Sequence, residues 1–194
     1  MIVLPDFAVR GSATPVFIDA GFTQRGVASL GRIDRKGSRY KLACTYGPFH
    51  PEQGRVMVSR LIAGKQEGVR IPYPLLVSQG APGAPVVDGA GHEGKTLPIR
   101  GLTPGYVCRE GYWLSITDTA GRSYLHNVKT GARADASGEM SVVLNELLRF
   151  PFLDGATINL AVPIVEGLVE GDEWAWSLSV DQVVPIEFTI EETR

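Results

Sequence analysis

The stretch "GAGHEGKTLPIRGLTPG", residues 89–105, decides between two fold classes. Its first eight residues match the phosphate-binding P-loop pattern G-x-x-x-x-G-K-[ST], with Gly89, Gly94, Lys95 and Thr96 in the required positions. A P-loop needs a strand before it and a helix after it, because the helix N-terminus and the loop amides together hold the phosphates. The residues after Thr96 therefore determine whether the chain has an α/β nucleotide-binding fold.

The residues after the loop argue against that helix. Pro98, Gly101, Pro104 and Gly105 occur in quick succession. In a helix interior, proline costs about 3 kcal/mol and glycine about 1 kcal/mol relative to alanine. Asp118, at the end of "YWLSITD", is the nearest candidate for a metal-holding carboxylate, but that run is more simply a strand ending in a turn. A glycine-rich loop is the simpler interpretation, and a P-loop NTPase is kept as an alternative.

The composition is that of a globular protein without a nucleic-acid footprint. The 194 residues are 44% apolar and 21% charged, with a formal net charge of -2 and scattered Lys and Arg. The N-terminal apolar run ends at Pro5, which is too short for a signal peptide. No apolar stretch approaches the ~20 residues that span a bilayer, so we expect no membrane insertion.

No residue type stands out for catalysis or for ligand binding. His50, His92 and His126 lack the spacing of metal ligands, and we expect them at surface or turn positions. A G-x-S-x-G motif is absent, and no pair of carboxylates stands out. We assign no catalytic, cofactor-binding or metal-binding residue, predict no cofactor, and expect that the protein is not an enzyme.

The two cysteines, Cys44 and Cys108, are too few and too far apart for a disulfide framework or a zinc site. Both lie in apolar, strand-like surroundings, where buried free thiols are common. We expect a reducing compartment.

Glycine and proline, 23 and 13 residues, divide the chain into short alternating runs, which is typical of sandwiches and barrels. A first strand is expected at 14–20, followed by a hairpin of 27–34 and 39–46 around Gly37. In the second of these runs, one face is expected to hold Tyr40, Leu42, Cys44 and Tyr46. One helix of about fourteen residues is expected within 50–68, with Val58, Leu61 and Ile62 at helical spacing and Gly64 or Gly68 at its end.

Residues 76–105 are expected to be rich in loops, and strands are expected to resume beyond them. The expected strand regions are 106–118, 123–135, 136–148 (after the turn "ADASGE"), 150–162, 173–180 and 186–191. Trp174 and Trp176 alternate with polar residues in the run 173–180. They are either core or subunit-interface residues, or a platform on which sugars stack.

Four segments carry a resemblance to a known family: "GAPVVDGAGHEGKTL" (83–97), "REGYWLSI" (109–116), "YLHNVKTGARADASGEMSVVL" (124–144) and "LLRFPFLDGATI" (147–158). Together with the closing "SVDQVVPIEFTIEE", they resemble distal tail proteins of long-tailed bacteriophages, over most of residues 25–194. The sequence departs from the family pattern at His92-Glu93, where Gln-Thr is usual, and at Glu110-Gly111-Tyr112, which replaces the usual Gly-Asp.

The resemblance implies a mainly β protein with a tail-tube-like β-barrel or sandwich, one α-helix and an inserted small β-domain. Residues 1–78 and 172–194 would form the ring domain, and residues 79–171 the outward-facing insertion. Candidate core residues of the insertion are Val107, Trp113, Leu114, Ile116, Tyr124, Val128, Val142, Val143 and Leu144. Cys44 and Cys108 would then lie in separate domains, unbridged.

The implied function is structural. The chain would assemble in the host bacterial cytoplasm and act in the virion, at the tail tip or baseplate. There a homohexameric ring would join the tail tube protein to the hub and fibre proteins. The alternative is a carbohydrate-binding module or adhesin, with Tyr112, Trp113, Trp174 and Trp176 as stacking residues.

We predict that the chain does not bind nucleotide at residues 89–96, because no helix can begin at Lys95. Isothermal titration calorimetry with ATP and magnesium should give no binding heat, and a Lys95→Ala variant should give the same trace. Binding at micromolar affinity that Lys95→Ala abolishes would contradict this prediction.

Overall fold

The computed structural model describes residues 1–26, 29–176 and 184–193. This part of the chain is mainly β, as predicted, with 45% of residues in strands and 9% in the single helix α1. By internal contacts the chain divides into two units, which are described separately. Unit 1 comprises Met1–Phe17, Tyr40–Pro74 and Val165–Thr193, and unit 2 comprises Ile18–Arg39 and Leu75–Ile164.

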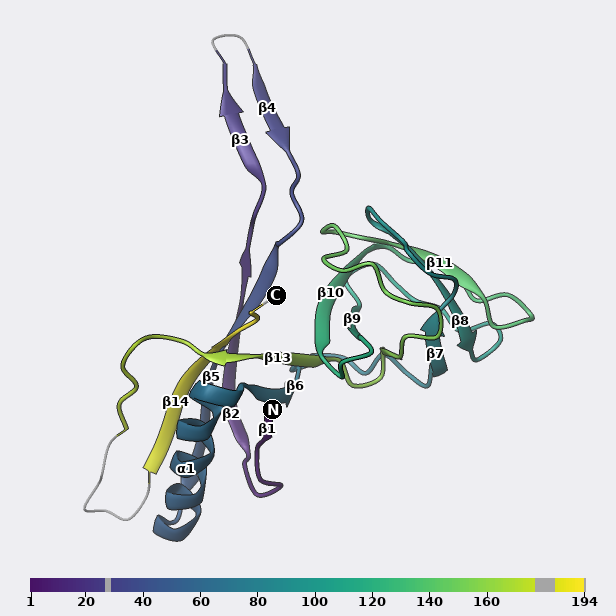
Figure 1. Cartoon of the computed structure of the whole chain (residues 1–194). Helices are drawn as coiled ribbons and strands as arrows, with labels where there is room; N and C mark the ends of the chain where they lie inside the picture. Colours follow the sequence, from purple (N-terminus) through teal and green to yellow (C-terminus); the bar gives the residue numbers. More distant parts are fainter. Residues whose placement is uncertain (27–28, 177–183, 194) are drawn as a thin grey trace. The chain divides into compact units, whose positions relative to one another are not determined.

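Unit 1 is built on a six-stranded sheet with the order β1-β6-β13-β14-β5-β2 (Figure 1). Its strands are β1 (Ile2–Val3), β6 (Val69–Pro72), β13 (Ile164–Val169), β14 (Val184–Glu191), β5 (Arg39–Phe49) and β2 (Arg10–Ile18). β14 pairs antiparallel with both β13 and β5, whereas β1 pairs parallel with β6. Strands from both ends of the chain therefore belong to one sheet.

The alternation predicted for β5 is confirmed. Tyr40, Leu42, Cys44 and Tyr46 are all buried, and the residues between them are half-buried. Cys44 is paired with Phe188 of β14, whose ring stacks on Tyr46 with centroids 5.5 Å apart. Because side chains alternate across a strand, the period of two in the sequence was enough to identify the buried face.

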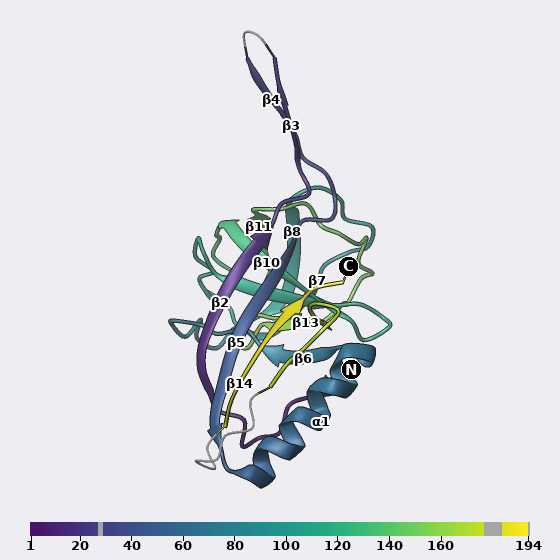
Figure 2. The same ribbon diagram turned by 90° about the vertical axis from the view of Figure 1, so that its left-hand side faces the viewer.

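Helix α1 (Pro51–Glu67) runs beside this sheet in both views (Figures 1 and 2). Pro51 occupies the first turn, where its missing N–H costs nothing, and the Gly68 N–H closes the helix on the Gly64 carbonyl. A Cβ on Gly64 would collide with Cγ2 of Val69, so only glycine permits this approach of helix to strand.

The buried face of α1 differs from the one expected. It consists of Gly54, Met57, Leu61 and Gly64, whereas Ile62 is 47% exposed. Two of these four buried residues are glycines, which carry no apolar side chain and so weaken the hydrophobic pattern of this face in the sequence. Of the two ends that were expected, Gly64 and Gly68, the helix ends at Gly68.

Unit 2 contains a second six-stranded sheet with the order β12-β9-β10-β11-β8-β7, which nearly closes into a barrel. Its strands are β7 (Gly83–Val87), β8 (Thr96–Leu102), β9 (Trp113–Thr117), β10 (Ser123–Thr130), β11 (Met140–Leu144) and β12 (Ile158–Asn159). The Val87 N–H donates to the Ala156 carbonyl at 2.9 Å, and the Gly155 N–H donates to the Val87 carbonyl at 3.0 Å. These bonds join β7 to the turn that leads into β12, the other end strand.

The barrel core contains most of the residues expected in it. Leu114, Ile116, Tyr124, Val128, Val142 and Leu144 are buried, whereas Val107, Trp113 and Val143 are half-buried. The predicted "ADASGE" turn is also present. Asp135 accepts hydrogen bonds from the Ser137 and Glu139 amides, and Gly138 has a φ of +78°.

Several strand predictions need correction. The hairpin partner of β4 (Leu30–Ile33) is β3 (Phe22–Arg25), not the run 39–46, which belongs to the unit 1 sheet. Two strands, β7 and β8, lie in the passage 76–105, which was expected to consist mainly of loops. The sequence pattern did not predict them because glycines with positive φ and prolines occur within and beside both strands. Residues 173–176 form no strand, and the rest of the run 173–180 lies outside the described residues.

The unit boundaries differ from the expected domain boundaries. β13 was placed in the insertion by the expected boundary at residue 171, yet it is an inner strand of the unit 1 sheet. Residues 18–39 were expected in the ring domain but are grouped with unit 2. The sequence "IVEGLVEGDE" was interpreted as a linker because its glycines are typical of loops, although its first six residues form β13.

We predict that the choice of excision point decides whether unit 1 folds alone. Replacing residues 79–163 by a short Gly/Ser linker keeps β13 and should leave a cooperatively unfolding protein, because closing such a gap costs only a few kcal/mol. Replacing residues 79–171 removes β13 from between β6 and β14 and should prevent folding. Circular dichroism during urea unfolding measures both. Equal stability of the two variants would show that β13 is dispensable.

Candidate assembly surface

Strands β3 and β4 form a two-stranded arm whose residues are all exposed. Phe22 lies opposite Ile33 in the register, and Arg25 lies opposite Leu30. Phe22 is 47% exposed, Ile33 55% and Leu30 70%. An isolated hairpin is only marginally stable in water, so these exposed apolar side chains make the arm a candidate assembly surface.

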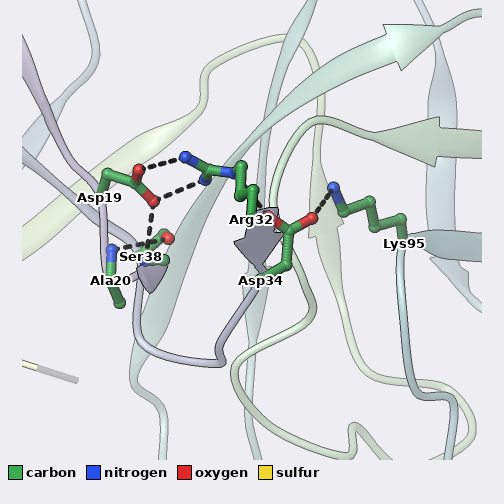
Figure 3. Close-up of polar contacts among 7 residues, drawn as sticks. Asp19, Ala20, Arg32, Asp34, Ser38 and Lys95 are labelled. Atoms are coloured by element: carbon green, nitrogen blue, oxygen red, sulfur yellow. Dashed lines mark hydrogen bonds and ion pairs between the residues drawn. The ribbon is translucent and has the colours of Figure 1, made fainter. Parts of the chain in front are cut away.

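Arg32 holds the two strands of the arm together near its base (Figure 3). Its guanidinium donates to both carboxylate oxygens of Asp19, at 2.7 and 2.9 Å, and to Asp34 at 2.8 Å. On the same side, the Ala20 N–H donates to Ser38 Oγ at 3.2 Å. A forked, planar guanidinium suits this position because it can bridge carboxylates that precede and follow the hairpin.

This arrangement changes the acidity of both carboxyl groups. The hydrogen bonds from Arg32 are the main cause that lowers the pKa of Asp19 from 3.8 to about 2. The pKa of Asp34 is also lowered, first by its hydrogen bond to Lys95 and then by Arg32. Both acids are therefore charged at neutral pH and able to hold the base of the arm.

Two lysine ion pairs tie the base of the arm to other parts of unit 2. Lys95 Nζ lies 2.7 Å from Asp34, and Lys36 Nζ lies 2.9 Å from Glu93 (Figure 3 shows the first pair). Lys95 and Glu93 belong to the stretch that matched the P-loop pattern. The lysine that would contact a phosphate thus contacts an aspartate of the arm.

The rest of the P-loop match is accounted for by structural contacts. β8 begins at Thr96, so a strand follows the loop and no helix does, which agrees with the expectation that the prolines and glycines exclude a helix there. The Gly89 N–H donates to Asp154 at 2.8 Å, and the Gly91 N–H donates to the Phe152 carbonyl at 3.1 Å. Two of the backbone amides that a phosphate-binding loop would use, those of Gly89 and Gly91, are therefore already bonded within unit 2.

In unit 1, β2 is the edge strand of the sheet and pairs with β5 alone among the described strands. Most of its nine residues are exposed, including Val16 at 46% and Phe17 at 49%. Phe17 contacts Tyr40 on one side, with ring centroids 5.3 Å apart. An exposed edge with apolar side chains offers both backbone hydrogen bonds and apolar area to another chain.

The histidines differ from the expectation in one case. His50 precedes helix α1, and His92 lies in the loop before β8 with Nε2 2.6 Å from the Asp88 carbonyl, as expected of surface or turn residues. His126, however, is fully buried in β10. Its Nδ1 lies 2.8 Å from Glu146, which is also buried. Spacing in the sequence gave no sign of this pair because twenty residues separate them.

The cysteines are buried as free thiols, Cys44 in unit 1 and Cys108 in unit 2. Burial raises the pKa of each thiol to about 11, which keeps both protonated and unreactive near neutral pH. Asp118, the acid that the P-loop alternative would have used, instead accepts hydrogen bonds from the Ala120 and Arg122 amides and from the Arg122 side chain.

The four aromatic residues considered for sugar stacking are divided between the two units. Tyr112 and Trp113 are half-buried in unit 2, whereas Trp174 and Trp176 belong to unit 1. The two unit 1 indoles contact each other, with centroids 5.2 Å apart. Sequence patterns did not identify Asp19, Arg32 and Asp34 as residues of this surface. The one sequence feature that marks them is a cluster of charged residues on either side of the run that forms the arm.

Within the described residues, no group of three or more His, Cys, Asp or Glu side chains is placed to hold a metal ion. Over the same residues, α1 is too short and too polar to cross a bilayer as a helix, and it is the only helix. Comparison with known proteins gave no match, either to a family model or to a curated sequence.

We predict that Asp19 titrates with a midpoint near pH 2 and that Arg32→Gln moves this midpoint up towards 3.8. Because the pKa is lowered in the folded arm, the contribution of Asp19 is complete above pH 3.8 and is lost as the pH falls through about 2. NMR titration of the Asp19 carboxyl carbon measures this. Arg35→Gln, which removes a neighbouring charge that does not bond Asp19 in the described contacts, should leave the midpoint in place. An unshifted midpoint in Arg32→Gln would contradict the assignment.

Proposed function

We propose that the protein is a structural component of a bacteriophage tail tip, whose copies associate into a ring that joins the tail tube to the hub and host-recognition apparatus. The observation that carries this proposal is the exposed arm, which bears Phe22, Leu30 and Ile33 on its two faces. Within the described chain these side chains keep 47–70% of their surface exposed. A neighbouring subunit that covers them removes apolar area from water and orders the hairpin.

The arrangement of apolar surface favours a ring over a simple pair. The arm and the β2 edge with Val16 and Phe17 are two different surfaces. When unlike surfaces of identical chains meet, each copy uses one surface towards each neighbour, and closure of the contacts gives a ring. The proposed contact places the arm of one subunit against the β2 edge of the next.

The resemblance to distal tail proteins supplies the rest of the proposal. It rests on the segments between residues 83 and 158 and on the closing strand, and it implies six subunits and contacts with tail tube, hub and fibre proteins. A structural rather than enzymatic role is proposed because the residues that stand out in unit 2 fix the base of an arm: Arg32 bridges two carboxylates, and Lys95 pairs with one of them.

We predict that the wild-type protein sediments at about six times its chain mass of 20.9 kDa and forms rings in negative-stain micrographs. The triple variant Phe22→Ser, Leu30→Ser, Ile33→Ser should sediment as a monomer with an unchanged circular dichroism spectrum, because the three side chains are already exposed in the single chain. Analytical ultracentrifugation at micromolar concentration measures both.

A matched control uses two equally exposed apolar residues of unit 2 outside the arm, Leu153 at 54% and Val162 at 56%. The double variant Leu153→Ser, Val162→Ser should still form the ring. A wild-type protein that stays monomeric at ~100 μM, well above the range in which stable interfaces associate, would contradict the proposal. Retention of rings by the arm variant would remove the arm from the interface.

A further inference from the structure

An open groove of about 510 Å³ lies on the face of the unit 1 sheet opposite Cys44 and Phe188. Its floor consists of side chains from neighbouring strands. Thr45 of β5 pairs with Glu187 of β14, and Ala43 pairs with Thr189. The small side chain of Ala43 leaves the middle of the floor low. The volume falls within the ~300–1,000 Å³ of ligand sites in proteins.

An indole forms one wall of this groove and is held in place by two contacts. Trp174 Nε1 donates a hydrogen bond to the Glu187 carbonyl at 2.8 Å. The same ring lies against Trp176 at 5.2 Å, with an interplanar angle of 34°. Trp174 is therefore fixed to the edge of β14 while remaining half-exposed. A core tryptophan would be enclosed, whereas this one presents an apolar surface to a groove.

The remaining lining is rich in groups that bond hydroxyls. Ser12 and Thr14 of β2 add two hydroxyls to those of Thr45 and Thr189, and each can donate and accept. Glu170 and Glu187 add carboxylate acceptors. No lysine or arginine is among the described lining residues, so the groove does not suit phosphate or an acidic ligand.

One of the two carboxylates at the groove already has a cationic partner, and the groove lacks an aromatic cage for a cation. Glu170 is already paired with Lys41, which also pairs with Glu191 at 2.8 Å. A site for a quaternary ammonium group typically surrounds the cation with several aromatic faces. Here the lining contains one indole beside hydroxyl groups, with the Phe188 ring on the opposite, buried face of the sheet.

We propose that this groove binds a neutral saccharide chain, with a sugar ring stacked on Trp174 and its hydroxyls bonded to the threonines and to Glu187. A sugar ring combines an apolar C–H face with a rim of hydroxyls that both donate and accept. The groove offers an indole at one wall, hydroxyls along its floor and carboxylate acceptors at its rim. Its open form accommodates a chain that continues beyond the bound rings.

The test is calorimetric titration of the full-length protein with maltohexaose, cellohexaose, mannohexaose and tetra-N-acetylchitotetraose. At least one should bind at micromolar to millimolar affinity, and Trp174→Ala should weaken that binding about tenfold or more, since ring stacking is lost. Trp174→Phe should keep part of the affinity. Ala43→Leu should abolish binding by filling the floor while circular dichroism stays unchanged.

Trp113→Ala is the matched control, because it removes a half-buried indole from unit 2 and should leave the affinity unchanged. Failure of all four saccharides to bind at 10 mM, well above the ~1 mM dissociation constants of weak ligands, would overturn the proposal. So would binding that Trp174→Ala leaves intact, or tighter binding of phosphocholine or sialyllactose than of any neutral sugar.

The saccharide proposal does not depend on ring formation. All lining residues lie in unit 1 of one chain, so the arm variant Phe22→Ser, Leu30→Ser, Ile33→Ser should bind the same saccharide with unchanged affinity. Loss of binding in that variant would overturn the proposal. A protein that binds saccharide but forms no ring would overturn only the proposed function.

Discussion

A strand at the edge of a sheet leaves backbone N–H and C=O groups without a strand partner, and each unit of this chain meets that constraint in its own way. In unit 2 the end strands β7 and β12 are joined through Val87, Gly155 and Ala156, so the sheet nearly closes on itself. In unit 1 the sheet stays open at β2, whose residues are largely exposed. Unit 2 therefore bonds the backbone groups of its end strands within the unit, whereas unit 1 keeps an edge strand, β2, to which a second chain can bond.

The arm extends the same contrast. Its two strands pair only with each other, so among the described strands no third one bonds their outward-facing backbone groups or covers their faces. Arg32, Asp19, Asp34 and Lys95 hold its base through ion pairs between partly exposed groups. Such pairs contribute little stability each and are weakened by salt, so they orient the hairpin more than they stabilise it. The apolar residues further along the arm are left to contact a partner.

Buried acids in this chain serve as structural partners. Glu146 meets His126 inside the barrel, and Glu166 pairs with Arg70 at 2.5 Å in the unit 1 sheet. The Glu192 carboxylate accepts a hydrogen bond from the Tyr40 N–H at 2.9 Å, which joins the end of β14 to the start of β5. Charges are costly to bury unless they are paired or hydrogen-bonded, and these acids meet that condition through residues far away in sequence. The exposed carboxylate Glu187 is different, because it lies at an open groove.

Local sequence patterns were sufficient for the fold class, the presence of helix α1 and the buried face of β5, because periodicity and proline and glycine chemistry set these features; they left the end of α1 open between Gly64 and Gly68. The same patterns excluded a helix after Lys95, and β8 begins where that helix would have been. Only the folded chain shows which runs pair. β4 pairs with β3 rather than β5, and β13 enters the unit 1 sheet although its glycines resemble a linker. Folding also brings His126 to Glu146 and Lys95 to Asp34, and it places Trp174 beside a groove. Which strands pair depends on which strand edges are still unpaired as the chain folds. Short-range sequence patterns show which face of a strand is buried, but they do not specify its partner strand.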